Sequence, residues 1–154
     1  MLTDGFHHVA VLTKDTQRFH RFYGDVFDAE VGPERIEGPG FLLTFVDIGS
    51  HTEINLFQVT GNGEPERQTP MFGRGRLDHL ALWAVSLEAF HQIRDRLVAH
   101  GASDGIVTDF GPILSVFFRD PDGLEGEICF ANPTAEPQVP RRSGRPAEGY
   151  GASS

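Results

Sequence analysis

The feature that most constrains the fold of this chain is an internal repeat. The segment "HVAVLTKDTQRFHRFYGDVF", which begins at His8, aligns without gaps with "HLALWAVSLEAFHQIRDRLV", which begins at His79. Two histidines, an alanine and a phenylalanine coincide at one offset of 71 residues, and apolar positions match along the rest. Because the match runs through a strand-like and then a helix-like pattern, it indicates two copies of one structural unit.

Each copy has the pattern of a strand, a helix and three further strands. We expect strands at 6–13, 29–34, 41–48 and 53–59 around a helix at 16–27, and strands at 77–84, 105–108, 113–119 and 125–131 around a helix at 87–100. Asp15 and Ser86 stand where a side-chain oxygen can cap the first turn of each helix. The chain is therefore predicted to be an α+β protein of two βαβββ modules.

Domain boundaries follow from composition. We expect residues 1–132 to form a single domain, with module one at about 5–60 and module two at about 77–132. The Gly/Pro-rich stretch 61–76 is predicted to link the modules. Residues 133–154 contain few apolar side chains and are predicted to form a flexible C-terminal tail.

Charge and composition exclude several classes of function. The formal net charge is −9, which makes nucleic acids and anionic membranes poor partners. No apolar run approaches the ~20 residues that a membrane helix needs, and the N-terminus lacks the pattern of a signal peptide. A single cysteine, Cys129, fits a reducing compartment. We therefore expect a soluble, acidic, cytoplasmic protein of a single domain.

The alternation of side chains along strands gathers polar residues on one face. Val9 and Val11 share a face with His7, and the aliphatic faces are expected to pack on the helices. His8, His79 and Glu127 then lie on the opposite faces.

In the strand at 53–59 the same opposite face carries Asn55 together with Glu53, and either could join the three. Two imidazoles and a carboxylate are a ligand set for a divalent metal with open coordination positions. A bound metal would also explain a buried carboxylate.

The remaining candidates have simpler interpretations. His7 is expected at the sheet edge, on the face away from His8. His20, His91 and His100 fall on the predicted helices and are expected at the surface, and Cys129 is expected to be a small packing residue.

The motifs "FHHVAVL", "LDHLALWA" and "FRDPDGLEGEICF" resemble the vicinal oxygen chelate superfamily over about residues 5–132. Its members include glyoxalase I, methylmalonyl-CoA epimerase, fosfomycin-resistance enzymes, extradiol dioxygenases and bleomycin-resistance proteins. The resemblance implies a cup-shaped mixed sheet around the metal, often in a homodimer. It also implies ligand positions at the first and last strand of each module, here His8, Asn55, His79 and Glu127.

The resemblance implies a divalent-metal-dependent enzyme that chelates a small substrate through neighbouring oxygens. His8, His79 and Glu127 would hold one ion of Fe, Mn, Zn, Ni or Co. The candidate catalytic residues are Glu127, Asn55 and Glu53, and the candidate pocket residues are Phe57, Trp83 and Phe117.

The reaction class stays open. Glyoxalase I carries a glutamate where Asn55 stands, and an asparagine cannot act as a carboxylate base, although Glu53 could reach the metal instead. The sequence is compatible with two classes of reaction: that of a dioxygenase and that of a lyase or isomerase. The alternative is a metal-free antibiotic-binding protein of the bleomycin-resistance type, whose members typically lack the two histidines.

Overall fold

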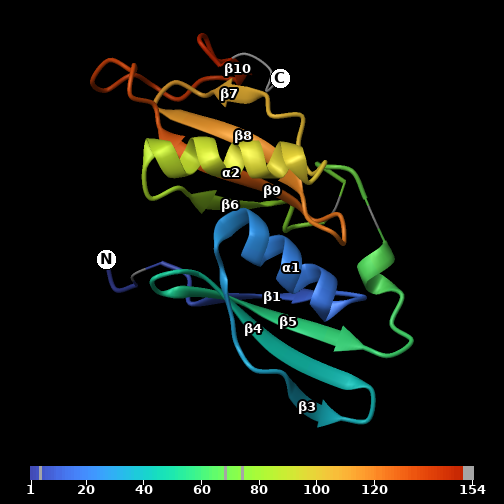
Figure 1. Ribbon diagram of the computed structural model, residues 1–154. Coiled ribbons are helices and arrows are strands. Elements are labelled where there is room, and N and C mark those ends of the chain that lie inside the picture. The colour runs from blue at the N-terminus through green and yellow to red at the C-terminus, as the bar shows by residue number, and fades with distance from the viewer. Residues whose placement is uncertain (4, 68, 74, 151–154) are drawn as a thin grey trace. The chain divides into compact units, whose positions relative to one another are not determined.

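The computed structural model describes residues 1–3, 5–67, 69–73 and 75–150, which divide into two compact units (Figure 1). Unit 1 comprises the described part of residues 1–68 together with the turn Pro121–Gly123, and unit 2 comprises the rest. Each unit contains one α-helix and one five-stranded sheet of mixed direction. The predicted α+β class with two βαβββ modules is therefore confirmed.

In unit 1 the sheet has the order β1-β5-β4-β2, and β3 also pairs with β4. The elements are β1 (His8–Leu12), α1 (Thr16–Phe27), β2 (Glu30–Val31), β3 (Arg35–Gly38), β4 (Phe41–Gly49) and β5 (Thr52–Val59). The β1–β5 pair is parallel and the other pairs are antiparallel. A short 3-10 helix, η1 (Glu64–Glu66), follows β5.

Unit 2 repeats this plan, in the order β10-β7-β8-β9-β6. Its elements are β6 (Leu80–Trp83), α2 (Leu87–Ala99), β7 (Val107–Asp109), β8 (Ile113–Arg119), β9 (Glu125–Ala131) and β10 (Arg145–Pro146). The first and last strands of the module, β6 and β9, again form the parallel pair. The repeat in the sequence is thus a repeat of strand pairing.

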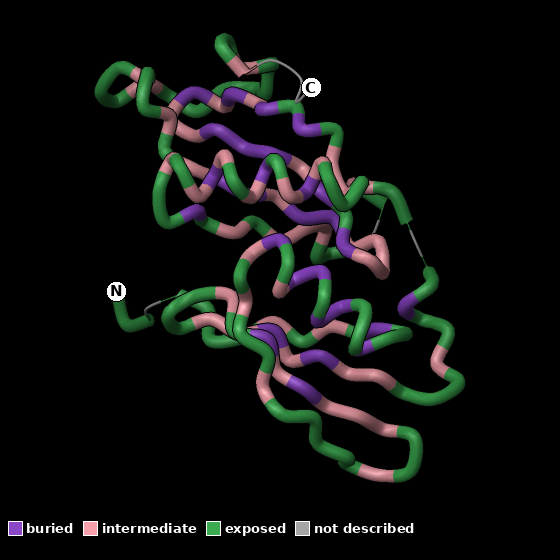
Figure 2. Tube along the Cα trace, viewed as in Figure 1, coloured by how far each residue is buried: buried purple, intermediate pink, exposed green. Residues whose placement is uncertain are grey.

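Local signals set the helix boundaries. The Asp15 carboxylate accepts a hydrogen bond from the Arg18 amide, and the Ser86 hydroxyl accepts one from the Ala89 amide, as the capping pattern predicts. Gly101, after α2, has a φ of +66°, which glycine adopts without strain. Buried and exposed positions alternate along both helices (Figure 2).

Each module has its own apolar core. Phe19 and Phe90 occupy the same position of the repeat and are 1% and 0% exposed. Both are on the apolar face of their helix, as the helical spacing predicts.

One predicted strand is shorter than expected, and it is followed by a strand that the sequence did not predict. The expected strand at 29–34 consists of β2 alone, and β3 follows after an interruption at Pro33. Proline has no amide hydrogen to donate to a ladder, so strand pairing with β4 stops there and resumes with β3.

The prediction that His20 lies at the surface is wrong, because its side chain is buried. His20 follows Thr16 by four residues and precedes Tyr23 by three, so it falls on the buried face of α1. Burial lowers the pKa of His20, and the nearby charge of Glu34 only partly opposes this.

The segment after β9 makes contacts that its composition did not predict. β10 pairs antiparallel with β7, and the ring of Tyr150 stacks on His91 of α2 at 5.5 Å. No helix in the described part of the chain is long and apolar enough to cross a membrane.

Candidate metal centre

The strand register defines which residues of the two modules are equivalent. In the parallel β1–β5 pair Ala10 is opposite Asn55, and in the parallel β6–β9 pair Ala81 is opposite Glu127. Ala10 and Ala81 each come two residues after the histidine of the repeat. Asn55, rather than Glu53, therefore occupies in module one the place that Glu127 occupies in module two.

In unit 2 the structure brings His79 and Glu127 together. The Nε2 atom of His79 lies 3.4 Å from Oε1 of Glu127, and its Nδ1 lies 2.9 Å from Oδ2 of Asp78. An ionised carboxylate only accepts hydrogen bonds, so Asp78 holds the imidazole proton on Nδ1 and leaves the lone pair of Nε2 facing Glu127.

This spacing suits two ligands of one ion. Atoms that bind a common divalent metal at about 2.1 Å, at angles between octahedral and tetrahedral, lie roughly 3.0–3.4 Å apart. A lone pair and a carboxylate oxygen facing each other at that distance repel unless a cation or a proton lies between them. The donor set at His79 and Glu127 therefore fits a divalent metal ion.

The second carboxylate oxygen of Glu127 accepts two hydrogen bonds. The Ser115 hydroxyl donates to Oε2 at 3.1 Å, and the Cys129 thiol donates to the same oxygen at 3.4 Å. Burial raises the pKa of Cys129 to about 12, and the charge of Glu127 adds to the increase. Cys129 thus acts here as a thiol that orients Glu127.

A cavity of about 480 Å³ opens beside this pair, within unit 2. Trp83, which is 60% exposed, contributes to its wall. Phe117 is opposite Glu127 in the β8–β9 ladder, and its ring meets the ring of Phe110, a lining residue, at 6.4 Å. The residues that line the cavity are His79, Ala81, Leu82, Trp83, Phe110, Ile113, Glu127, Cys129, Arg141 and Arg142.

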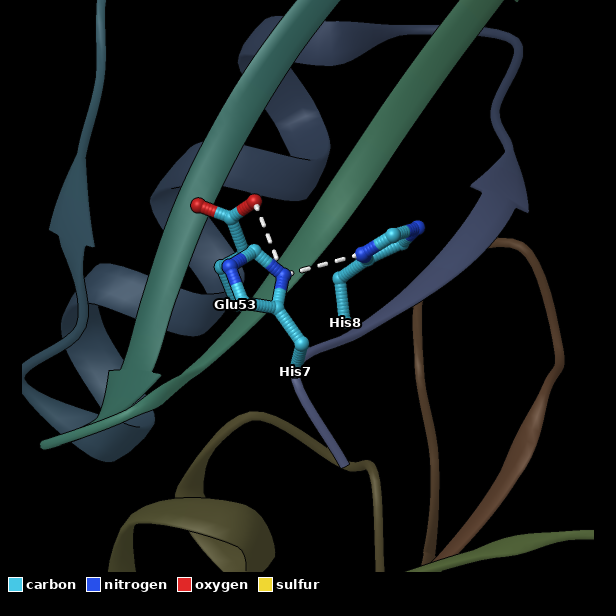
Figure 3. Close-up of side chains that lie close together, drawn as sticks. All are labelled: His7, His8 and Glu53. Carbon is cyan, nitrogen blue, oxygen red and sulfur yellow. Dashed lines mark hydrogen bonds and ion pairs between the residues drawn. The ribbon is translucent and has the colours of Figure 1, made fainter. Parts of the chain in front are cut away.

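In unit 1 a second group of possible ligands gathers at the start of β1 (Figure 3). The Nδ1 atoms of His7 and His8 lie 3.0 Å apart, and Nδ1 of His7 lies 3.9 Å from Oε1 of Glu53. Both histidines are exposed. The expectation that His7 points away from His8 is wrong, because His7 lies in a bend before β1, where strand alternation does not apply.

The surroundings of this histidine cluster are acidic. His7 and Glu53 line a cavity of about 630 Å³ in unit 1, together with Asp28, Glu30 and Asp47. Further along β5, the ring of Phe57 stacks on Phe41 with a centroid distance of 5.7 Å.

Asn55 shows an unsatisfied oxygen. Its Oδ1 atom is buried and has no hydrogen-bond partner in the described part of the chain. Buried polar atoms are normally paired, and an orphaned one calls for an explanation such as an unseen ion. Asn55 thus offers a free oxygen ligand at the position that matches Glu127.

Of the predicted metal ligands, the structure brings together His79 and Glu127 in unit 2 and places His8 beside Glu53 in unit 1. A site that joins His8 to His79 and Glu127 stays a prediction. Sequence reasoning missed Asp78 and Ser115, although Asp78 directly precedes the histidine in "LDHLAL".

Each of the two βαβββ modules has a histidine at or just before its first strand. Each also has an oxygen-bearing side chain, Asn55 or Glu127, at the matching place on its last strand. The family model of the Glyoxalase/Bleomycin resistance protein/Dioxygenase superfamily matches residues 5–128. The chain belongs to this superfamily, which confirms the resemblance.

Solved structures share the fold. A glyoxylase/bleomycin resistance protein/dioxygenase domain from Frankia sp. EAN1pec is 23% identical, with a TM-score of 0.67 over 86% of this chain and 95% of that one. A glyoxalase family protein from Enterococcus faecalis is 25% identical, with a TM-score of 0.63 over 84% and 99%. The fosfomycin resistance protein FosX from Listeria monocytogenes, complexed with Mn(II) and sulfate, is 18% identical, with a TM-score of 0.61 over 86% and 96%.

Proposed function

We propose that this chain is a divalent-metal-dependent enzyme in which His8, His79 and Glu127 hold one metal ion beside a cavity for a small, oxygen-bearing substrate. The observation that carries the proposal is the pair of His79 and Glu127 at 3.4 Å, with the imidazole oriented by Asp78. The Mn(II)-bound FosX neighbour supports a metal in this fold. We further expect a cytoplasmic homodimer.

When bound, the metal would act as a Lewis acid that polarises substrate oxygens at its open positions. Glu127 would supply the one negative ligand charge, and the hydrogen bonds that Ser115 and Cys129 donate to its second oxygen would orient it. Asn55 is neutral, so it can bind or orient an oxygen but cannot remove a proton. Proton transfer on the module-one side would require Glu53, two residues earlier on the same strand face.

These roles favour a reaction that needs no carboxylate at position 55. A dioxygenase, or a lyase or isomerase that uses Glu53 as its base, satisfies this condition. Trp83, with Phe57 and Phe117, would contact the apolar part of the substrate.

The second candidate is a metal-free protein that binds an antibiotic, as suggested by the bleomycin-resistance name of the family. The aromatic wall of the 480 Å³ cavity favours it, because such pockets bind small apolar molecules without catalysis. The His79–Glu127 pair argues against it, because a binding pocket of that type does not need two metal ligands at this spacing.

Metal analysis of protein purified without chelator tests the proposal. We expect close to one equivalent of a divalent transition metal per chain, and its loss in His79→Ala and in His8→Ala. His91→Ala, a histidine change on α2 in unit 2, is the matched control and should keep the metal. Absence of metal from the wild type, together with no uptake of added Mn²⁺ or Zn²⁺, would favour the antibiotic-binding alternative.

A further inference from the structure

The segment after β9 is held against β7 at several points. The Arg142 amide donates to the Phe110 carbonyl at 3.1 Å, and the Ala147 amide donates to the Val107 carbonyl at 2.9 Å. Gly111 has a φ of +92°, and a Cβ there would lie 2.6 Å from the Pro140 carbonyl oxygen, so only glycine permits this approach. The backbone near residue 141 is therefore fixed beside the cavity of unit 2.

The two neighbouring arginines of this segment differ in their partners. The Arg142 guanidinium pairs with Oδ2 of Asp109, and Arg145 lies 3.6 Å from the same oxygen. Within the described residues Arg141 forms no ion pair, and its side chain lines the cavity.

The rest of the cavity combines an apolar wall with the metal ligands. Trp83, Leu82, Phe110 and Ile113 form the apolar part, and the carboxylate of Glu127 is already engaged by His79, Ser115 and Cys129. A metal ion on His79 and Glu127 would add two positive charges. Even without the metal, Arg141 is a positive charge of the cavity lining with no ion-pair partner among the described residues, next to an apolar surface.

We propose that the substrate of this site is a carboxylate on an aromatic or aliphatic body, and that Arg141 binds the carboxylate while Trp83 and Phe110 contact the body. The proposal rests on the function proposed above, because it names the substrate class of the same site. Arginine suits this role because its planar guanidinium can donate two parallel hydrogen bonds to a carboxylate.

Trp83 provides the measurement, since it is the one tryptophan of the chain and lines the cavity. Benzoate and its neutral isostere benzamide are titrated into the full-length, chelator-treated protein while tryptophan fluorescence is followed. We expect benzoate to change the fluorescence and to bind more tightly than benzamide.

Variants at position 141 test the role of its charge. Arg141→Met should weaken benzoate binding roughly three- to tenfold, the range expected for an exposed charged contact, and leave benzamide binding within about twofold. Arg141→Lys should restore part of the preference. Arg76→Met, an exposed arginine change elsewhere in unit 2, is the control and should match the wild type. Equal binding of the two probes, no fluorescence change with benzoate, or an unaltered preference in Arg141→Met would overturn the proposal.

Repeating the titration after addition of Mn²⁺ separates this proposal from the proposed function. If the protein binds no metal but Arg141 still selects benzoate over benzamide, the enzyme proposal fails and the carboxylate site stands. If Mn²⁺ binds and His79→Ala abolishes its binding, while benzoate shows no preference, the enzyme proposal stands and the carboxylate site fails.

Discussion

The two modules carry the same histidine but different oxygen-bearing residues. His8 and His79 are the same residue at the same place in the repeat, but the position opposite the alanine two residues later is Asn55 in one module and Glu127 in the other. A set of two neutral imidazoles, one amide and one carboxylate carries a single negative charge. Such a set leaves positive charge on a divalent ion to polarise substrate oxygens.

Asp78→Asn should weaken metal binding about 10- to 100-fold, because the amide would no longer hold the imidazole proton on Nδ1. Asparagine retains the oxygen that accepts from the Phe72 amide, so the fold should persist. Titration with Zn²⁺ measures the change. Asp104→Asn, which keeps a similar hydrogen bond to the Ile106 amide, is the matched control. Unchanged affinity in Asp78→Asn would show that the His79 tautomer does not limit binding.

Asn55→Glu should have opposite effects without and with metal. A carboxylate oxygen at the buried, unpartnered place of the Asn55 Oδ1 atom is costly in the apo protein, so the melting temperature should fall. Divalent metal should raise the melting temperature of Asn55→Glu above that of the metal-bound wild type, since the new carboxylate would be an additional ligand. Thermal melts with and without Zn²⁺ test this, with the exposed Asn62→Glu as control. A destabilisation that metal does not reverse would place position 55 outside the metal site.

At the scale of elements, local patterns predicted the helices and the long strands. Apolar spacing and the caps Asp15 and Ser86 are local, so 16–27 agrees with α1, and the alternating segments 113–119 and 125–131 agree with β8 and β9. The contact of His7 with His8 depends on a bend before β1, and β10 depends on pairing with β7, which lies some forty residues earlier. Such features arise from tertiary contacts that periodicity does not report.

The Pro133–Tyr150 segment should loosen from β7 in acid. Burial tends to raise the pKa of Asp109, but the Gly111 amide and the guanidinium groups of Arg142 and Arg145 hold it below the ordinary value of about 4. Because the folded pKa is depressed, this stabilisation is fully present above about pH 4 and is lost as the pH falls through the folded pKa.

Asp109→Asn should produce part of the same loosening at neutral pH. Trypsin should then cleave after Arg141 and Arg142 several-fold faster, as measured by mass spectrometry of the fragments. Asp104→Asn should cleave at the wild-type rate. Equal rates in Asp109→Asn and the wild type would mean that this ion pair does not hold the segment.

At the scale of the whole molecule, each module has a core of its own, while the sequence predicts that residues 1–132 form one domain. Phe19 and Phe90 are the equivalent buried residues of the two cores. Replacing either by alanine should cost about 3–5 kcal/mol in the free energy of unfolding.

If the two modules form one cooperative domain, both units should unfold in a single transition. Trp83 reports unfolding of unit 2, whereas far-ultraviolet circular dichroism reports both units. Phe19→Ala, in unit 1, should shift the urea midpoint equally by both probes. Phe6→Ala, an exposed phenylalanine change in unit 1, should leave both near the wild-type value. An unshifted Trp83 transition in Phe19→Ala would show that the modules unfold independently.

The proposed site binds one divalent metal ion through His8, His79 and Glu127. Calorimetric titration of Mn²⁺ into the wild type, His8→Ala, His79→Ala and His7→Ala tests it most directly, because His7 belongs only to the cluster with Glu53. We expect one site per chain, with binding lost in His8→Ala and His79→Ala and retained in His7→Ala. Binding that is lost in His7→Ala and unaffected by His79→Ala would contradict it.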